Sequence, residues 1–426
     1  MSQGVRSVAI VGGGVVGLCC AHYLRRAGLA VTVLERGRVG GGTSRGNAGE
    51  LCLDLVAPLP APGVIGPALR GLARRDSPLY VRPRPDLALA RFLVGFARHS
   101  TARRYTAGVA ALARLARGGF ALFEELEAAG VHGDPVKDGF LFGFGSRETA
   151  AASLRVQREL GAPVGELLDT AALTDLEPAL GPAARAGYLV EDQWSMDPSL
   201  FVDRLAESVR AAGVRIIEGA RVTGVGPTRF GTRVRSSRGD VDADTAVLAA
   251  GIWSGELCRR LGVPVNLYPG KGYSFSVDAD PLPRRVVHLG DARVVLTPMG
   301  KRLRVAGTME FDRDPEAFHP RRVAAVVEGA RDYLRGVDWA ARQEEWVGAR
   351  VMTPDGLPGI GRLPGSPRVL LASGHNMLGL MLAPATGRLV TDLVTGHADP
   401  VLAAALDPAR LARPTVRRIV RAAGPR

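Results

Sequence analysis

Residues 8–17 read Val-Ala-Ile-Val-Gly-Gly-Gly-Val-Val-Gly, an apolar strand followed by the glycine spacing GxGxxG. Gly12 allows a tight turn, Gly14 lets the backbone approach a pyrophosphate, and Gly17 lets a helix pack closely on the strand. The N-terminus of that helix attracts phosphate groups. The stretch therefore predicts the start of a Rossmann-type, dinucleotide-binding βαβ unit.

The rest of the unit follows directly. A helix is expected over Val15–Ala27 and a second strand over Ala30–Leu34, with Gly28 between them. Glu35 stands at the end of this strand, 18 residues after Gly17. A carboxylate there accepts hydrogen bonds from a ribose diol and favours a free 2′-hydroxyl over a 2′-phosphate. A lone glycine motif is weak support, but the complete unit with its acid predicts a dinucleotide site.

The βαβ unit alone does not distinguish NAD from FAD, and two other segments favour FAD. Residues 36–47 form a glycine-rich loop that can cover a bound dinucleotide. Residues 246–251 form a small-residue strand ending in glycine, as expected where backbone passes close to an extended cofactor. An ordinary buried strand explains residues 246–251 almost as well, and an NAD-dependent enzyme stays the weaker alternative.

The composition suits a soluble enzyme with two domains. At 426 residues the chain exceeds what one hydrophobic core usually holds. Its 46% hydrophobic and 23% charged residues argue against a disordered protein. The four cysteines lack a CxxC spacing, which favours a reducing, cytoplasmic location. The uncharged run of residues 8–21 is too short to span a bilayer.

The formal net charge of +13 comes almost entirely from arginine, since the chain has only Lys137, Lys271 and Lys301 besides. Nine arginines lie between Arg70 and Arg104, and six follow Asp407. A solvated surface in an arginine-rich proteome is the simpler interpretation. No nucleic-acid partner is therefore expected, while peripheral contact with the inner face of a membrane stays open.

The order of elements predicts an α/β protein in which one domain is discontinuous. Within it, Asp197 as N-cap and Pro198 at the first helical position predict the start of a helix. A Rossmann-type FAD-binding domain is expected over residues 1–83, 197–262 and 345–412. A substrate-binding domain with a mixed or antiparallel sheet is expected over residues 84–196 and 263–344, followed by a basic tail over residues 413–426.

Further motifs along the chain resemble those of a known family. They are Thr43-Ser44-x-x-Asn47-Ala48-Gly49-Glu50, Leu176-Glu177-Pro178-Ala179-Leu180, Tyr268-Pro269-x-Lys271-Gly272-Tyr273, Met352-Thr353-Pro354-Asp355-Gly356, and Gly374-His375 with Leu378-Gly379. With the N-terminal glycine motif, they resemble the D-amino-acid dehydrogenase group of the glycine oxidase/D-amino-acid oxidase superfamily. Residues 383–387 are closer to the glycine-oxidase version. The resemblance runs in order over nearly the whole chain and implies the fold of that superfamily.

The resemblance implies a set of FAD contacts. The turn 47–50 would lie beside the flavin ring, and the backbone of Val222 would contact the adenosine half. The turn 374–380 would bring a helix N-terminus near the flavin N1–C2=O locus, where reduction places negative charge. Gly348 stands where sarcosine-oxidase-type relatives carry a flavin-linking cysteine, so non-covalent FAD is expected. The expected cofactor-binding residues are Gly12, Gly14, Val15, Val16, Gly17, Glu35, Arg36, Thr43, Ser44, Asn47, Ala48, Gly49, Glu50, Val222, Ala250, Gly251, Gly374, Asn376, Leu378, Gly379 and Leu380.

The resemblance also implies the substrate side of the site, and no metal is expected there. Arg350 aligns with the arginine that binds the substrate α-carboxylate, for which a planar fork of donors is well suited. Tyr273 is expected to hydrogen-bond the substrate, or to be an ordinary strand aromatic. His375 joins the catalytic candidates because of its place near the flavin, without the role of general base. The substrate-pocket residues are Trp194, for which a structural role fits equally well, Lys271 and Thr308.

The activity implied by the resemblance is oxidative deamination of an amino acid, with a D-amino acid as substrate. The α-hydrogen of a neutral amine would transfer as hydride to flavin N5, and water would hydrolyse the imine to a 2-oxo acid and ammonia. The alternative is an oxidase of glycine, sarcosine or a cyclic secondary amine. Val351 replaces the family's proline, and Cys52-Leu53-Asp54 replaces its Ser-Pro-Gly, so the exact substrate stays open. The electron acceptor (O2, a quinone or another carrier) and the oligomeric state also stay open.

Overall fold

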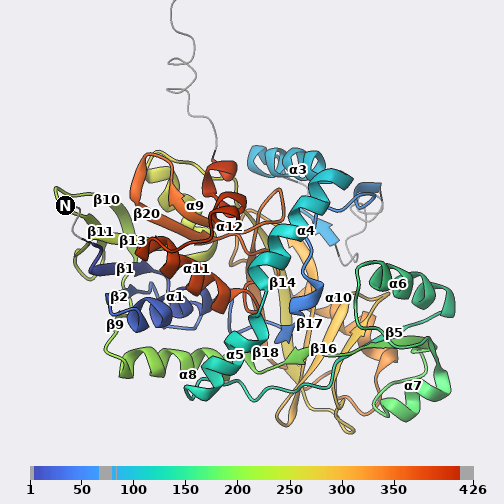
Figure 1. Cartoon of the computed structure of the whole chain (residues 1–426). Helices are drawn as coiled ribbons and strands as arrows, with labels where there is room; N and C mark the ends of the chain where they lie inside the picture. Colours follow the sequence, from blue (N-terminus) through green and yellow to red (C-terminus); the bar gives the residue numbers. More distant parts are fainter. Residues whose placement is uncertain (1–3, 67–78, 83, 413–426) are drawn as a thin grey trace, which may run out of the picture.

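Two large β-sheets stand side by side in the molecule (Figure 1). The computed structural model describes residues 4–66, 79–82 and 84–412. The expected tail, residues 413–426, and the first part of the arginine-rich stretch, residues 70–78, lie outside the described residues. Within the described ranges, no helix combines the length and apolar character needed to cross a bilayer.

The first sheet has six strands in the order β19-β20-β13-β1-β2-β9. Neighbouring strands pair in parallel, except that β19 runs antiparallel at the edge. Residues 8–11 of the inner strand β1 are buried, because a parallel strand in this position is covered on both faces. Helices α8 and α11 pack against α1 on one of these faces. This sheet and its helices confirm the predicted Rossmann-type architecture. The bounds are β1 (Ser7–Val11), β2 (Ala30–Leu34), β9 (Arg215–Ile217), β13 (Thr245–Leu248), β19 (Gly359–Leu363), β20 (Ser366–Ser373), α1 (Val15–Arg26), α8 (Pro198–Ala211) and α11 (Ala383–Thr395).

The second sheet has nine strands in the order β18-β14-β17-β16-β15-β5-β7-β6, with β4 beside β17. Most neighbours are antiparallel, but β5 runs parallel to β15 and β4 runs parallel to β17. The predicted mixed sheet is therefore confirmed. The bounds are β4 (Leu79–Val81), β5 (Phe140–Phe144), β6 (Leu168–Asp169), β7 (Ala186–Val190), β14 (Tyr268–Val277), β15 (Val286–Leu289), β16 (Val294–Met299), β17 (Arg302–Phe311) and β18 (Gln343–Met352).

The two faces of the nine-stranded sheet differ, because side chains alternate between them along each strand. Helix α10 (Pro320–Ala330) covers one face, on which Tyr273 and Phe275 of β14 join a buried apolar core. We call this side the helix face. The opposite side carries Gly272 of β14 and Arg350 of β18 and is crossed by residues 43–50. We call it the loop face.

The division between the two sheets differs from the expected domain limits in two places. Strands β4 and β18 were expected to fall wholly or largely in the cofactor domain, yet both pair in the nine-stranded sheet. Helices α4 (Ala102–Ala116) and α5 (Gly119–Ala128) were expected in the substrate domain, yet Leu112 and Phe123 join the core around α1. Strand pairing for β4 and β18, and apolar packing for α4 and α5, join segments far apart in the chain, so local sequence does not show these memberships.

The remaining elements connect and flank the two sheets. A three-stranded sheet of β10, β11 and β12 packs beside the six-stranded sheet, and β3 pairs with β8. The bounds are β3 (Glu50–Leu51), β8 (Trp194–Ser195), β10 (Val222–Pro227), β11 (Thr232–Ser236), β12 (Val241–Ala243), α3 (Leu87–His99), α6 (Arg147–Glu159), α7 (Thr170–Leu176), α9 (Ser254–Arg260) and α12 (Pro400–Leu406).

Candidate active site

The glycine turn after β1 is closed by backbone that leaves no room for side chains. Gly12 has a φ of +109°, and a Cβ there would lie 2.4 Å from the carbonyl oxygen of Ala249. A Cβ at Gly17 would lie 2.0 Å from the carbonyl oxygen of Gly12. Gly14 precedes Val15, whose N–H donates to Ser44 Oγ at 3.0 Å. Val16 follows in the first turn of α1, so this turn forms a cradle at a helix N-terminus.

Glu35 closes the same cradle from the end of β2. Its Oε2 accepts the N–H of Gly13 at 2.7 Å, and its Oε1 accepts the N–H of Gly37 at 2.9 Å. The next residue, Arg36, places its guanidinium carbon 3.4 Å from the centre of the Trp253 ring. A carboxylate, a glycine cradle and a helix N-terminus fit the ribose and pyrophosphate of a dinucleotide.

Three further cofactor candidates surround this turn. The Cα of Ala250 would lie 2.8 Å from a Cβ at Gly12, and the carbonyl of Gly251 accepts Ser373 Oγ–H at 3.0 Å. Val222 opens β10 just after Ala220, whose N–H donates to the carbonyl of Glu35 at 2.7 Å. The fold thus collects these residues from separate segments around one site.

Residues 43–50 cross the loop face of the nine-stranded sheet from β18 towards β15. Thr43 Oγ1 donates to the carbonyl of Ala349 in β18 at 3.3 Å. Side chains of the sheet then hold the segment, because Ser274 Oγ donates to Gly46 O at 3.0 Å and Thr297 Oγ1 donates to Ala48 O at 2.7 Å. The N–H of Gly49 donates to Asn47 Oδ1 at 2.8 Å. This segment joins the glycine cradle to the sheet.

The polar side chains of the turn 374–380 form hydrogen bonds within the protein and do not point out of it. Asn376 Oδ1 accepts the N–H of Thr353 at 2.9 Å, and its Nδ2 donates to Gly374 O at 3.0 Å. His375 Nε2 lies 2.9 Å from Thr386 Oγ1 in α11, and burial lowers the pKa of His375 to about 4. Leu378, Gly379 and Leu380 continue into α11. This turn can therefore offer a cofactor its backbone groups and the nearby helix N-terminus, but not the side chains of Asn376 and His375.

Arg350 lies on the loop face against the backbone of β14. A Cβ at Gly272 would lie 2.4 Å from Arg350 Nη1, so only glycine leaves room for the guanidinium. Nη1 donates to Thr308 O at 3.0 Å. Burial lowers the pKa of Arg350 to about 10, against the opposing effect of the Glu50 charge. The side chain is therefore a largely desolvated but still partly accessible cation that remains charged at neutral pH.

Thr308 holds Arg350 from a strained position. The strands shift register here, because Lys271 pairs with Glu310 whereas Tyr273 pairs with Gly307, which makes Thr308 part of a β-bulge. Its φ of +63° is rare for a β-branched residue. Among the described residues, its buried Oγ1 has no hydrogen-bond partner. A strained residue with a free buried hydroxyl beside a desolvated cation is typical of a binding site.

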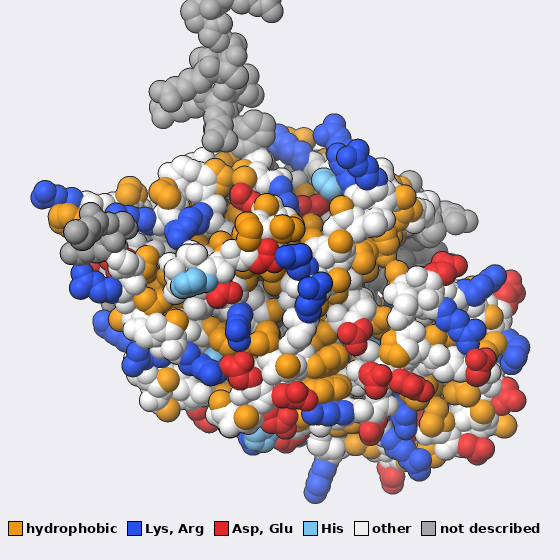
Figure 2. All heavy atoms as spheres, in the orientation of Figure 1, with side chains coloured by type: hydrophobic (Ala, Val, Ile, Leu, Met, Phe, Trp, Pro, Cys, Tyr) orange, Lys and Arg blue, Asp and Glu red, His pale blue; other side chains and the backbone are white. Residues whose placement is uncertain are grey.

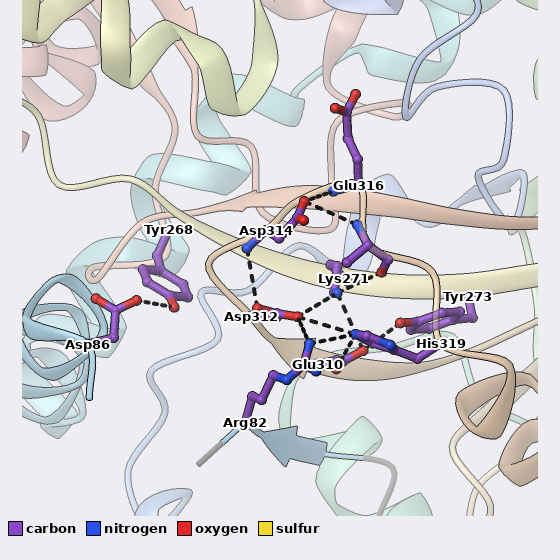
Figure 3. A network of polar contacts seen from close by, with 11 residues as sticks. Arg82, Asp86, Tyr268, Lys271, Tyr273, Glu310, Asp312, Asp314, Glu316 and His319 are labelled. Atoms are coloured by element: carbon purple, nitrogen blue, oxygen red, sulfur yellow. Dashed lines mark hydrogen bonds and ion pairs between the residues drawn. The ribbon is translucent and has the colours of Figure 1, made fainter. Parts of the chain in front are cut away.

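Lys271 and Tyr273 do not lie beside Arg350, because they point to the helix face. Figure 3 shows Lys271 at the centre of a polar network. Its Nζ lies 3.1 Å from Asp312 Oδ2 and donates to Ala317 O at 2.8 Å, while Tyr273 OH donates to Glu310 Oε2 at 2.5 Å. The sequence-based assignment of Lys271 and Tyr273 to the substrate site therefore has no support in this geometry.

The same network contains three possible metal ligands, Glu310, Asp312 and His319. Cationic side chains already occupy them, since Arg82 Nη1 lies 2.8 Å from Asp312 Oδ2 and Lys271 lies on the other side. Burial alone would raise the pKa of Asp312. Hydrogen bonds from Arg82 and Lys271 outweigh this effect and hold that pKa well below its usual range. The network is a set of ion pairs that joins Lys271 of β14 to Asp312, directly after β17, and to Arg82, directly after β4.

Trp194 also faces away from the loop-face site. It pairs with Leu51, while Glu50 pairs with Ser195, so Trp194 and Glu50 project to opposite sides. The Trp194 ring packs 4.6 Å from Phe120, with the Lys137 ammonium 3.8 Å from its centre. This setting matches the structural alternative for Trp194.

Sequence reasoning missed two residues that reach the site from other strands. Trp346 lies on the loop face of β18 and contacts Gly46 and Gly348 so closely that neither position can carry a Cβ. His288 of β15 contacts Glu50. No local signal marks either residue, because each contact depends on which strands become neighbours.

The chain matches known proteins over most of its length. The family described as "DAO: FAD dependent oxidoreductase" matches residues 7–393. A D-amino acid dehydrogenase of Cereibacter sphaeroides is 34% identical over 437 residues, covering 96% of this chain and 98% of the relative. D-amino acid dehydrogenase 2 of Pseudomonas aeruginosa is 36% identical over 400 residues, covering 91% and 94%. The family resemblance predicted from the motifs is confirmed.

Solved structures show the same fold. Glycine oxidase from Geobacillus kaustophilus superposes with a TM-score of 0.73 at 24% identity, covering 96% of this chain and all of that chain. Iminodiacetate oxidase from Chelativorans sp. BNC1 superposes with a TM-score of 0.70 at 20% identity, covering 94% and 98%. The pairing of a Rossmann-type sheet with a mixed sheet is thus common to these proteins.

Proposed function

The chain belongs to the family of FAD-dependent oxidoreductases named above, and on that premise we propose that it oxidises the Cα–N bond of a D-amino acid. The product is an imine, which water hydrolyses to a 2-oxo acid and ammonia. The preference for D-amino acids is supported by the printed names of the relatives from C. sphaeroides and P. aeruginosa.

Non-covalent FAD is part of this proposal. Gly12, Gly14 and Glu35, with the N-terminus of α1, would hold the dinucleotide, and bound flavin supplies the acceptor for two electrons. Gly348 has no thiol for a covalent link, and a Cβ at this position would lie 1.6 Å from the Trp346 ring. The acceptor that regenerates the oxidised enzyme is O2, a quinone or another carrier.

Arg350 would bind the substrate α-carboxylate. Its desolvated guanidinium attracts an anion more strongly than an exposed one does, because water screens the charge less. The planar fork can donate two parallel hydrogen bonds to one carboxylate. Thr308 O fixes one edge of the guanidinium at 3.0 Å, so the clamp can orient the Cα–H bond.

A protein base has no place in this proposal. His375 is enclosed against Thr386, and burial lowers its pKa to about 4, so its imidazole is neutral at physiological pH. The substrate amine then binds in its neutral form. Positioning of the substrate is the main contribution of the protein.

The observation that carries the proposal is the desolvated Arg350 on the glycine-lined loop face. Anaerobic bleaching of the bound flavin with a panel of D-, L- and N-alkyl amino acids tests it. D-amino acids should bleach the flavin with the highest kcat/KM. Bleaching only by glycine, sarcosine or cyclic secondary amines would favour the alternative oxidase, and no bleaching by any amino acid would refute the proposal.

Peripheral contact with a membrane is a further part of the proposal, supported by helix α3. Leu87 is 75% and Val94 52% exposed, on a helix that also exposes Arg91 and Arg98. Figure 2 shows basic and hydrophobic side chains together around this helix. The enzyme should sediment with anionic phospholipid vesicles at low salt and detach in high salt. Equal recovery in the supernatant with and without vesicles would exclude this contact.

A further inference from the structure

Glu50 and His288 form a pair on the loop face. Glu50 opens β3, and its Oε1 contacts Nε2 of His288 in β15. The His288 ring stacks on Phe142 of β5, with 4.3 Å between ring centres and 9° between their planes. The Glu50 and His288 side chains remain 20% and 22% exposed. Stacking therefore positions the imidazole, which lies against a carboxylate that solvent can still reach.

Glu50 and Arg350 are opposite charges that face the same region. Glu50 is the charged group that acts on the guanidinium of Arg350 in this structure. Arg350 reaches β17 through Thr308 O, while Glu50 reaches β15 through His288. Strand β16 lies between β17 and β15, so the two contact points are two strand spacings apart, roughly 10 Å. A molecule with an anionic end and a cationic end can span this separation.

The α-amine of the substrate is a poor partner for Glu50. A carboxylate beside an amine favours the charged ammonium form, whereas oxidation of the Cα–N bond in the proposed mechanism needs the neutral amine. Glu50 is therefore better placed for a cationic group farther along the substrate.

We propose that Glu50, which lies against His288, forms the end of the substrate pocket opposite Arg350 and selects amino acids with a cationic side chain. The proposal rests on the proposed function, since it assigns the α-carboxylate to Arg350. Diamino acids such as lysine and ornithine belong to this class. Because a hydrogen bond to a charged group is stronger than a neutral one, losing the carboxylate reduces binding of the cation on the order of 10- to 100-fold.

The matched substrates D-lysine and D-norleucine test this selectivity, because both have a four-carbon side chain and only lysine ends in an ammonium group. The measured quantity is the ratio of kcat/KM for D-lysine to kcat/KM for D-norleucine, with the full-length, FAD-loaded enzyme. Glu50→Gln, which is isosteric and uncharged, should lower this ratio by about tenfold or more. His288→Phe keeps a ring on Phe142 but removes the contact with Glu50, and it should lower the ratio by a smaller factor.

A matched control is Glu166→Gln, which removes a surface ion pair with Arg158 in which Glu166 is 90% exposed. This variant should keep the parental ratio. An unchanged ratio in Glu50→Gln, or a parental enzyme that strongly prefers D-norleucine, would overturn the inference. If Glu50→Gln does not retain flavin, the ratio in His288→Phe decides in the same way. Failure of every amino acid to bleach the flavin would instead refute the proposed function, and the inference with it.

Discussion

Charged side chains on the two faces of the nine-stranded sheet have different kinds of partner. On the helix face, Lys271 lies between Asp312 and Glu310, and each charge has a partner. On the loop face, Arg350 is only partly buried and donates to a neutral carbonyl group, Thr308 O. Removing one member of a buried ion pair destabilises the fold, whereas a cation whose hydrogen bond goes to a neutral carbonyl can still bind an external anion. The same strand, β14, supplies both environments through successive residues.

The largest effect in this comparison is expected on the helix face. Lys271→Met removes the ammonium but keeps the side-chain length, and it leaves Glu310 and Asp312 buried with fewer partners. Breaking a buried ion pair in this way costs about 3–5 kcal/mol, which denaturant unfolding should measure. Lys301→Met, at an exposed position, is the control. A parental stability combined with a collapse of kcat/KM would instead return Lys271 to the substrate pocket.

On the loop face, the expected change is in catalysis and not in stability. Arg350→Ala should lower kcat/KM at least about a hundredfold, equivalent to roughly 2.7 kcal/mol. Arg350→Lys should recover only part of this loss, because an ammonium cannot reproduce the fork. The visible flavin spectrum should persist, and Arg302→Ala at the exposed start of β17 should keep parental kinetics. Parental kinetics in Arg350→Ala on the best amino-acid substrate would show that the proposed pocket is wrong.

His375 is another buried ionisable group, outside both faces of the nine-stranded sheet. Its protonation should make the stability of the fold depend on pH. Its pKa is lowered to about 4 in the folded protein by burial, compared with about 6.5 for an ordinary histidine. A base with a lowered folded-state pKa contributes its stability above the unfolded pKa and loses it as pH falls from about 6.5 to about 4.

At pH 5 the loss from His375 amounts to about 2 kcal/mol. His375→Gln should reduce the difference in unfolding free energy between pH 7 and pH 5 by about this amount. His397→Gln, at an exposed histidine, should leave the difference unchanged. If His375→Gln unfolds with the parental pH dependence, the imidazole does not resist protonation as inferred.

The smallest expected effect tests the free hydroxyl of Thr308. Thr308→Val keeps the branched shape but removes the buried Oγ1, which has no partner among the described residues. The melting temperature should rise, because an unsatisfied buried hydroxyl is lost. If the hydroxyl binds the substrate, KM should rise by about 2- to 10-fold, the equivalent of one neutral hydrogen bond. An unchanged KM would leave Thr308 only the role of holding Arg350 through its carbonyl.

Much of the cofactor-binding half could be predicted because its signals are local. The turn at Gly12 and the close packing at Gly17 follow from a spacing that only glycine tolerates. Asp197 accepts the N–H groups of Ser199 and Leu200 as the predicted N-cap. Glu35 directly follows β2, the position at which the βαβ motif predicted a ribose-binding carboxylate. Each feature is marked by residue types at a fixed spacing along one stretch of chain, so the sequence itself carries the signal even where the contact partner, such as Ala249, is distant.

The substrate-binding half could not be predicted in the same way, because it depends on which strands become neighbours. No local stretch of sequence contains that information. Lys271 and Tyr273 looked like pocket residues beside Gly272, yet strand alternation turns them to the helix face. Glu50 was predicted as a flavin neighbour, but its contact with His288 arises only because β15 lies under residues 43–50. The periodicity of a strand determines which residues share a face. Sheet order and register, set by contacts between segments distant in the chain, decide what that face meets.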